Sequence, residues 1–240
     1  MMAAGPDRTI ESFGGAGKML AVLGMCLFST LAQGQSVTVG PGASLSLDGG
    51  AMNLGCGDLT IEGQVSIGSG SAGGIGNIDI SGGTLTMDAG AVSLSGDWRN
   101  SGTFSAGTGQ VVIEDGCGLA TSNLSGDNDF HDFSVTSTSG KLLSVAAGSS
   151  QFFASSLTLQ GIIGNLLLIR SSMTGQQVFF SLAENGDQSI AAVDVSDNNA
   201  SGGQPLAPGA PEDSDSVDSG NNENWFTELL DFIFDDGFET

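Results

Sequence analysis

The feature that most constrains this chain is a repeat between Val37 and Leu94, in which short runs of alternating apolar and small polar residues recur. Each run has the period-two pattern of a β-strand with one buried face, and Gly, Ser, Asp or Asn residues separate it from the next run. The apolar residues fall into three interleaved series that recur about every 20 residues. The series are Val37/Val39, Leu59/Ile61 and Ile78/Ile80; Leu45/Leu47, Val65/Ile67 and Leu85/Met87; and Leu54, Ile75 and Leu94.

Three series with one period predict an all-β fold, a parallel β-helix (solenoid) with Gly-rich turns and roughly 20 residues per coil. The alternative is an antiparallel β-sandwich or meander, because Gly-rich joints serve hairpins equally well. After Leu94 the period loosens, and from Leu119 to Val195 the predicted strands are longer and more apolar. We therefore predict one β-helix-like repeat domain over residues 35–195.

Residues 1–34 have the pattern of a leader with a secretory signal peptide. Lys18 precedes an apolar run of 14 residues, 19–32, and small residues follow it. The run is too short to span a membrane. We expect cleavage after Ala32 or Gly34, a mature chain that is secreted or held at the outer cell surface, and no transmembrane span in that mature chain.

Cleavage of the leader leaves two cysteines, Cys56 and Cys117. An even number of cysteines in an oxidising compartment favours a disulfide. Their separation of 61 residues corresponds to about three coils, or ~14 Å along a stack of strands ~4.8 Å apart, whereas a bridge needs Cα atoms within ~7 Å. Two alternatives remain open: a disulfide made possible by an irregular coil near Gly116, or two free thiols.

The C-terminal part changes composition twice. Residues 196–222 are almost devoid of apolar side chains and predict an acidic linker or loop. Residues 223–240 predict an amphipathic tail with a short helix, because Phe226, Leu229, Leu230 and Ile233 recur at helical spacing. The tail, which begins beside Trp225, is either a cap on the β domain or a signal recognised by export machinery.

Charge and side-chain chemistry exclude several function classes. The net charge is −22, with 27 acidic and 5 basic residues, so the chain is a poor partner for nucleic acid.

Trp98 is a candidate for ligand stacking, or a large side chain that seals a change in coil geometry. His131 lies between acidic residues and on the opposite face of its predicted strand from Phe130, so we expect it to be exposed and not part of a catalytic triad or metal site. Asp213, Asp215 and Asp218 do not have the spacing of a calcium loop. We expect no catalytic residues, no metal site and no cofactor.

Three blocks of sequence carry a resemblance to known proteins. They are LGCGDLTIEGQVSIGSGS at 54–71, LSGDWRNSGTFSAGTGQVVIEDGCG at 94–118, and the stretch 164–226 that ends VDSGNNENWF. Together they resemble the adhesin-like, filamentous-haemagglutinin-like β-helix repeats of large exported bacterial proteins, and the ending FDDGFE is similar to tails on exported gammaproteobacterial proteins. The resemblance implies a secreted or surface module and transfers no functional residues.

From these observations we expect a secreted or cell-surface structural or adhesive β-repeat module without catalytic activity. Its partner would be a surface protein or polysaccharide that the sequence does not identify. The alternative is a carbohydrate-binding module, or a glycoside hydrolase that works on a β-helix with two carboxylates alone.

Overall fold

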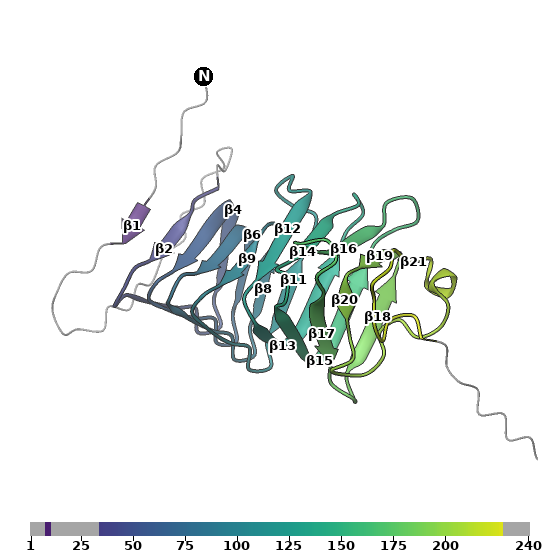
Figure 1. The fold of residues 1–240 in the computed structure, drawn as a ribbon. Helices are drawn as coiled ribbons and strands as arrows, with labels where there is room; N and C mark the ends of the chain where they lie inside the picture. Colours follow the sequence, from purple (N-terminus) through teal and green to yellow (C-terminus); the bar gives the residue numbers. More distant parts are fainter. Residues whose placement is uncertain (1–7, 11–33, 228–240) are drawn as a thin grey trace, which may run out of the picture.

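The structure, a computed structural model, describes residues 8–10 and 34–227 of the 240-residue chain. It is an all-β parallel solenoid of about eight turns with about 22 residues in each turn. The strands stack side by side along one axis from β2 to β21 (Figure 1). In the described residues the one antiparallel contact is a bridge between Ile162 and Asn165. The predicted parallel β-helix is therefore confirmed, and the antiparallel alternative was wrong.

Each turn contributes to three stacked ladders of parallel strands. Ladder 1 consists of β2 (Val37–Val39), the second halves of β4 (Ala51–Ile61) and β6 (Ser71–Ile80), β9 (Trp98–Asn100), β12 (Thr121–Ser125), β14 (Leu142–Val145), β16 (Leu167–Ser171), β19 (Val193–Ser196) and β21 (Val217–Asp218).

Ladder 2 begins as a separate four-stranded sheet and continues with strands of the larger sheet. It consists of β3 (Ser44–Ser46), β5 (Gln64–Ser66), β7 (Thr84–Thr86), β10 (Thr103–Ser105), the first halves of β13 (Asn128–Thr136) and β15 (Ser150–Gln160), β17 (Val178–Leu182) and β20 (Asn198–Asn199).

Ladder 3 completes the triangle of each turn. It consists of the first halves of β4 and β6, β8 (Ala91–Leu94), β11 (Gln110–Ile113), the second halves of β13 and β15, and β18 (Asp187–Ala191). Two further elements lie at the ends: β1 (Arg8–Ile10), which pairs in parallel with β2, and the 3₁₀ helix η1 (Pro211–Ser214).

The predicted apolar series form the interior of the first coils. Val37 pairs with Leu59 and Leu59 with Ile78 in ladder 1, and Leu45 pairs with Val65 and Val65 with Leu85 in ladder 2. In ladder 3 Ile75 pairs with Leu94. Leu54 is buried in the same core but is out of register, because the pairing of β4 with β6 shifts after Asn53. Stacking of like side chains on one inward face explains why the series recur so regularly.

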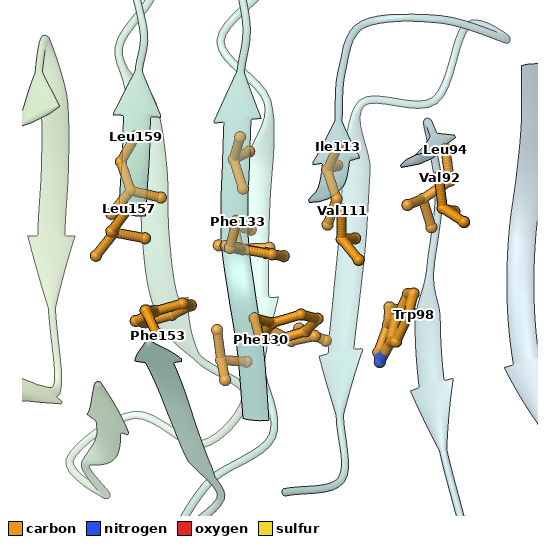
Figure 2. Packing of buried hydrophobic residues seen from close by; sticks show 14 of the residues in the cluster. Val92, Leu94, Trp98, Val111, Ile113, Phe130, Phe133, Phe153, Leu157 and Leu159 are labelled. Atoms are coloured by element: carbon orange, nitrogen blue, oxygen red, sulfur yellow. The ribbon is translucent and has the colours of Figure 1, made fainter. Parts of the chain in front are cut away.

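From β9 onward a column of aromatic side chains joins the aliphatic side chains of the core. Trp98 and Phe130 are fully buried, and their ring centroids lie 5.5 Å apart. Phe153 follows 6.0 Å from Phe130, and Phe180 follows 5.4 Å from Phe153. Figure 2 shows the row of Trp98, Phe130 and Phe153 beside aliphatic side chains of β8, β11 and β15, such as Leu94, Ile113 and Leu159. The column continues to Trp225, 6.4 Å from Phe180.

Residues 196–222 differ from the acidic linker that we expected. β20 pairs with β17, β21 pairs with β19, and the side chain of Asn198 is fully buried. Backbone hydrogen bonds and buried Asn side chains order this segment even though it has few apolar residues. The solenoid therefore runs past residue 195, and composition alone was a misleading guide to its end.

The start of the expected tail closes the C-terminal end of the solenoid. Leu206 and Trp225 form a parallel bridge, and Trp225 and Phe226 are 5% and 9% exposed. The predicted helix of the tail lies outside the described residues, as does most of the predicted leader.

Candidate functional site

Cys56 and Cys117 form a disulfide, with Cα atoms 5.4 Å apart. Cys56 lies at the corner between ladders 3 and 1, in the middle of β4, and Cys117 lies at the corresponding corner between β11 and β12. The two corners are about three coils apart, as the sequence indicated. The bridge therefore requires that one of the two segments leave its own coil.

The segment that leaves its coil is residues 114–120, which we call the disulfide loop. It folds back along the corner over the preceding coil: a Cβ on Gly116 would come within 2.4 Å of Ser95 Oγ, and a Cβ on Gly96 within 2.8 Å of Leu119 Cδ1. Glycine at both positions permits this close approach. The irregular coil near Gly116 is thus the alternative that the structure supports, and the free-thiol alternative was wrong.

Lys141 holds the disulfide loop from inside. Its side chain is fully buried, and Nζ donates hydrogen bonds to Ser95 O (2.8 Å), Leu119 O (2.6 Å) and Ser122 Oγ (3.3 Å). Burial lowers the pKa of the Lys141 ammonium, and the nearest carboxylates only partly offset that effect. All three donors of the ammonium are used within the fold, so Lys141 has a structural role.

Asp115 holds the same loop from outside. Its Oδ2 accepts hydrogen bonds from the backbone N–H groups of Thr138 (2.7 Å) and Ser139 (3.0 Å) in the turn before β14. Burial alone would raise the pKa of Asp115, but these bonds and those from the Ser137 and Ser139 hydroxyls outweigh it and leave the pKa below its usual value. The loop is thereby fastened to coils on both sides of its own.

A ladder of Asp and Asn side chains runs along the same corner, and our sequence analysis missed it. Asp58 N donates to Ser36 Oγ (3.0 Å), and Asp58 Oδ1 accepts from Asn77 N and Nδ2, both at 2.8 Å. Asn77 Oδ1 accepts from Asp97 N (2.8 Å), and Asp97 Oδ1 accepts from Asn123 N (2.7 Å) and Nδ2 (2.9 Å). Each side chain thus satisfies the backbone of the next coil.

A sequence signal for this ladder exists in the repeated pattern Gly-Asp/Asn-apolar. It occurs as Gly57-Asp58-Leu59, Gly76-Asn77-Ile78 and Gly96-Asp97-Trp98. A Cβ on Gly76 would lie 2.7 Å from Asp58 Oδ1, and a Cβ on Gly96 would lie 2.3 Å from Asn77 Oδ1. Glycine is required at 76 and 96 because the polar side chain of the previous coil occupies that space, and at 57 because the backbone of Gln35 and Ser36 does.

Trp98 and Trp225 are both structural. Trp98 is fully buried and its Nε1 donates to Asn128 Oδ1 (2.9 Å), while Trp225 Nε1 donates to Asn198 Oδ1 (2.8 Å). Of the two interpretations of Trp98, the geometry supports the side chain that seals a change in coil, and the ligand-stacking interpretation was wrong.

The other cations of residues 34–227 are also engaged. Arg99 pairs with Asp97, and Arg170 Nη2 lies 2.7 Å from Asp194 Oδ2; both arginines are on the outer side of ladder 1. With Lys141 buried, this stretch of the chain presents no unpaired Lys or Arg. Its outer surface therefore offers little to an anionic ligand.

His131 lies on β13, partly exposed, with Nδ1 3.2 Å from Asp132 Oδ2. Burial would raise the pKa of Asp132, but hydrogen bonds from the Ser156 and Ser155 hydroxyls and the neighbouring His131 hold that pKa below its usual value. In the described residues no hydrogen bond joins the His131 imidazole to a serine or cysteine side chain that could act as a nucleophile.

Two open depressions lie beside the C-terminal half of ladder 2, and Phe152 lines both of them. The first, about 300 Å³, is lined by Phe104, Ser105, Ala106, Gly107, Asp129, Phe130, His131, Phe152 and Ala154. The second, about 460 Å³, is lined by Phe152, Leu182, Ala183, Glu184, Ser201, Gly202, Gly203 and Gln204. Each depression is lined by a single carboxylate, Asp129 or Glu184.

Two features of the described residues concern metals and membranes. No group of three or more His, Cys, Asp or Glu residues in that part of the chain is placed to hold a metal ion. Asp213 Oδ2 accepts from Ala210 N, and Asp218 Oδ1 accepts from Gly220 N and Asn222 Nδ2. In the same residues no helix has the length and apolar character needed to cross a membrane.

The geometry defines the molecule as a parallel β-solenoid with one disulfide and an aliphatic core, to which the C-terminal half adds a column of aromatic side chains. Comparisons with models of protein families, with curated proteins and with solved structures found no match. The fold and its surfaces therefore carry the functional argument.

Proposed function

We propose that this chain is a non-catalytic structural or adhesive module that works outside the cell, at the surface or after secretion. The observation that carries the proposal is the continuous stack of parallel strands from β2 to β21 around one unbroken core. Such a stack pairs nearly every backbone group with a neighbouring coil, which makes a rigid rod that resists proteases.

Two features support an extracellular site. The Cys56–Cys117 disulfide is of the kind that persists in oxidising compartments. The net charge of −22 favours solubility and limits association between like molecules. The adhesin-like resemblance of the sequence points the same way, and an adhesive rod needs only a stable scaffold and one face that contacts a partner.

The non-catalytic part of the proposal rests on how the acids are distributed. A glycosidase needs two carboxylates about 5–10 Å apart across a cleft. Each depression beside Phe152 is lined by one acid. We therefore favour a binding or scaffolding role over hydrolysis.

The location is tested in the cells that make the protein. An antibody against the folded solenoid should label intact cells or detect the protein in the medium. Lysis of the cells should add little to the signal. Labelling that appears only after lysis would reject the extracellular role.

The export route is tested by N-terminal sequencing of the protein from the envelope or medium. We expect the mature chain to begin near Gln33 or Gln35, after removal of the leader. Protein that carries an intact Met1 or Met19 terminus would contradict the cleaved signal peptide.

A further inference from the structure

The outer face of ladder 2 begins as a regular array of uncharged polar side chains. The array consists of Ser44 and Ser46 on β3, Gln64 and Ser66 on β5, Thr84 and Thr86 on β7, and Thr103 and Ser105 on β10. They lie in register, so two rows run along the axis with a rise of about 4.8 Å per coil. Within the described residues only Ser46 has a side-chain partner, the carboxylate of Asp48.

The same face continues into the C-terminal half with aromatic side chains. Phe152 on β15 is 38% exposed and Phe179 on β17 is 40% exposed, and they are the two aromatics among the exposed large apolar side chains of the described residues. Phe152 stands opposite Asp129 on one side and Ser181 on the other. It also lines both depressions, and the first of them reaches Ser105 on β10, at the end of the hydroxyl array.

The other two outer faces use much of their polar chemistry internally. On ladder 1 the Asp and Asn side chains of the corner ladder bind one another, and Arg170 pairs with Asp194. On ladder 3 Ser156 donates to Asp132 and Gln160 donates to Ser189. Ladder 2 is the face that combines unpaired hydroxyls with exposed aromatic rings.

We propose that the ladder-2 face binds a neutral polysaccharide chain laid along the solenoid axis. The rings of Phe152 and Phe179 provide apolar platforms for the C–H faces of sugar rings, and the Ser and Thr rows exchange hydrogen bonds with sugar hydroxyls. Asp129 and Glu184, one in each depression, accept further hydroxyl hydrogen bonds. This inference rests on the proposed surface role and names the class of ligand that the surface module would hold.

Charge decides between polysaccharides. The face carries Asp129 and Glu184, and the three Lys and Arg residues of 34–227 are buried or paired on other surfaces. A polyuronate or sulfated chain would meet uncompensated negative charge, whereas a neutral chain would not. A ligand with repeating hydroxyls also matches a surface whose own hydroxyls repeat along one direction.

Binding is tested with the full chain by isothermal titration calorimetry against three neutral hexasaccharides, namely cellohexaose, chitohexaose and maltohexaose, and against polygalacturonate. We expect at least one neutral hexasaccharide to bind and polygalacturonate to bind at least about tenfold more weakly. No heat with any neutral probe at millimolar concentration, or equal binding of polygalacturonate, would overturn the proposal.

Variants locate the site. Phe152→Ala with Phe179→Ala should weaken binding by at least about tenfold, as loss of central aromatic anchors does elsewhere. Thr84→Val with Thr86→Val keeps the side-chain shape, removes two hydroxyls and should weaken binding by a few fold. Two control variants lie away from ladder 2: Ile163→Ala shortens an exposed apolar side chain, and Thr158→Val removes a hydroxyl on the outer side of ladder 3. Both should leave binding unchanged. Thermal melts confirm that each variant is folded.

Three results of this series would refute the site. Undiminished binding by the Phe variant would rule out the two aromatic platforms, and equal losses in the control variants would show that the effect is not local. Self-association that the Phe substitutions abolish, seen by sedimentation in the absence of sugar, would assign the face to a second copy of the chain. Each of these results leaves the extracellular scaffold role intact, because that role is judged by cell labelling.

Discussion

The coils from β2 to β11 and the coils from β12 to β21 build the same three ladders around different interiors. In the first region ladder-1 partners are 22, 19 and 20 residues apart, and the core is aliphatic. From Trp98 onward several steps are 26 residues long, as between Trp98 and Leu124 and between Leu143 and Ile169. Longer coils can enclose more volume, and the Phe column fills it.

The difference shows what makes a repeat regular. In the narrow coils the corner has room only for Gly followed by Asp or Asn, because a Cβ at Gly76 or Gly96 would collide with the polar side chain of the coil before. Every coil is therefore held to nearly the same length. In the wider coils the corners carry loops, such as the bridged turn Ile162–Asn165, and coil length varies.

The largest expected effect comes from a charge in the narrow interior. Ile67 is fully buried, so Ile67→Asp should lower the free energy of unfolding by roughly 5 kcal/mol, through an unpaired charge between stacked coils. Its neighbour Ser66 points outward, and Ser66→Asp should change stability by no more than about 0.5 kcal/mol. Urea unfolding measures both, and equal losses would mean that the assigned inward face is wrong.

The aromatic column should be more sensitive to truncation than the aliphatic side chains of the narrow coils. Phe153 contacts the rings of Phe130, Phe133 and Phe180, so Phe153→Ala should cost about 3–5 kcal/mol. Leu85→Ala in the narrow coils should cost about 2–4 kcal/mol. The same urea experiment compares them, and a larger loss at Leu85 would show that the wide coils collapse around the cavity.

Removing the disulfide tests how strongly the narrow coils are tied to the wide ones. Replacing both Cys56 and Cys117 by Ser should cost about 2–4 kcal/mol, since the bridge closes a segment of 61 residues. Reduction of the unmodified protein should reproduce the loss. If neither change affects urea unfolding, the contacts of Lys141 and Asp115 alone hold the disulfide loop.

The same contrast between the two regions explains how much of the fold could be predicted from the sequence. The period of the residues in 37–94 predicted the strands, their inward faces and the parallel stacking, because each coil there repeats the last. In the wide coils the reading was weaker. The run Leu166–Ile169 has no apolar–polar alternation to show which side chains face inward, and in the structure Leu168 lies on the partly exposed side.

The polar contacts were harder to predict for a physical reason. The Cys56–Cys117 disulfide depends on a loop that leaves its coil, and such a loop cannot be predicted by counting residues per coil. The Asp58–Asn77–Asp97–Asn123 ladder was visible as a Gly-Asp/Asn pattern but could be recognised only once the corner was known. Residues 196–222 looked like a linker because their ordering comes from hydrogen bonds and not from apolar burial.

The smallest effect, and the most local, concerns the fastening of the disulfide loop by Asp115. The folded-state pKa of this carboxyl lies below the ordinary value of 3.8 because Thr138 and Ser139 donate to it. A depressed folded pKa contributes stability that is present above the unfolded pKa and is lost as pH falls through the folded value. We therefore expect this contribution at neutral pH and its loss below about pH 4.

Asp115→Asn isolates that contribution from the many other acids of a chain with 27 of them. The amide keeps an acceptor oxygen but forms weaker bonds than the ionised carboxylate. At pH 7 the variant should therefore melt slightly below the unmodified protein, and the two melting temperatures should converge as the pH falls toward 3. A constant difference across this range would show that Asp115 acts through packing and not through its charge.

Asp132→Asn is the matched control, because its carboxyl also has a lowered pKa but contacts Ser156 and His131 instead of the loop. Amide exchange at Thr138 and Ser139 should rise in Asp115→Asn alone, which separates the loop fastening from general acid destabilisation.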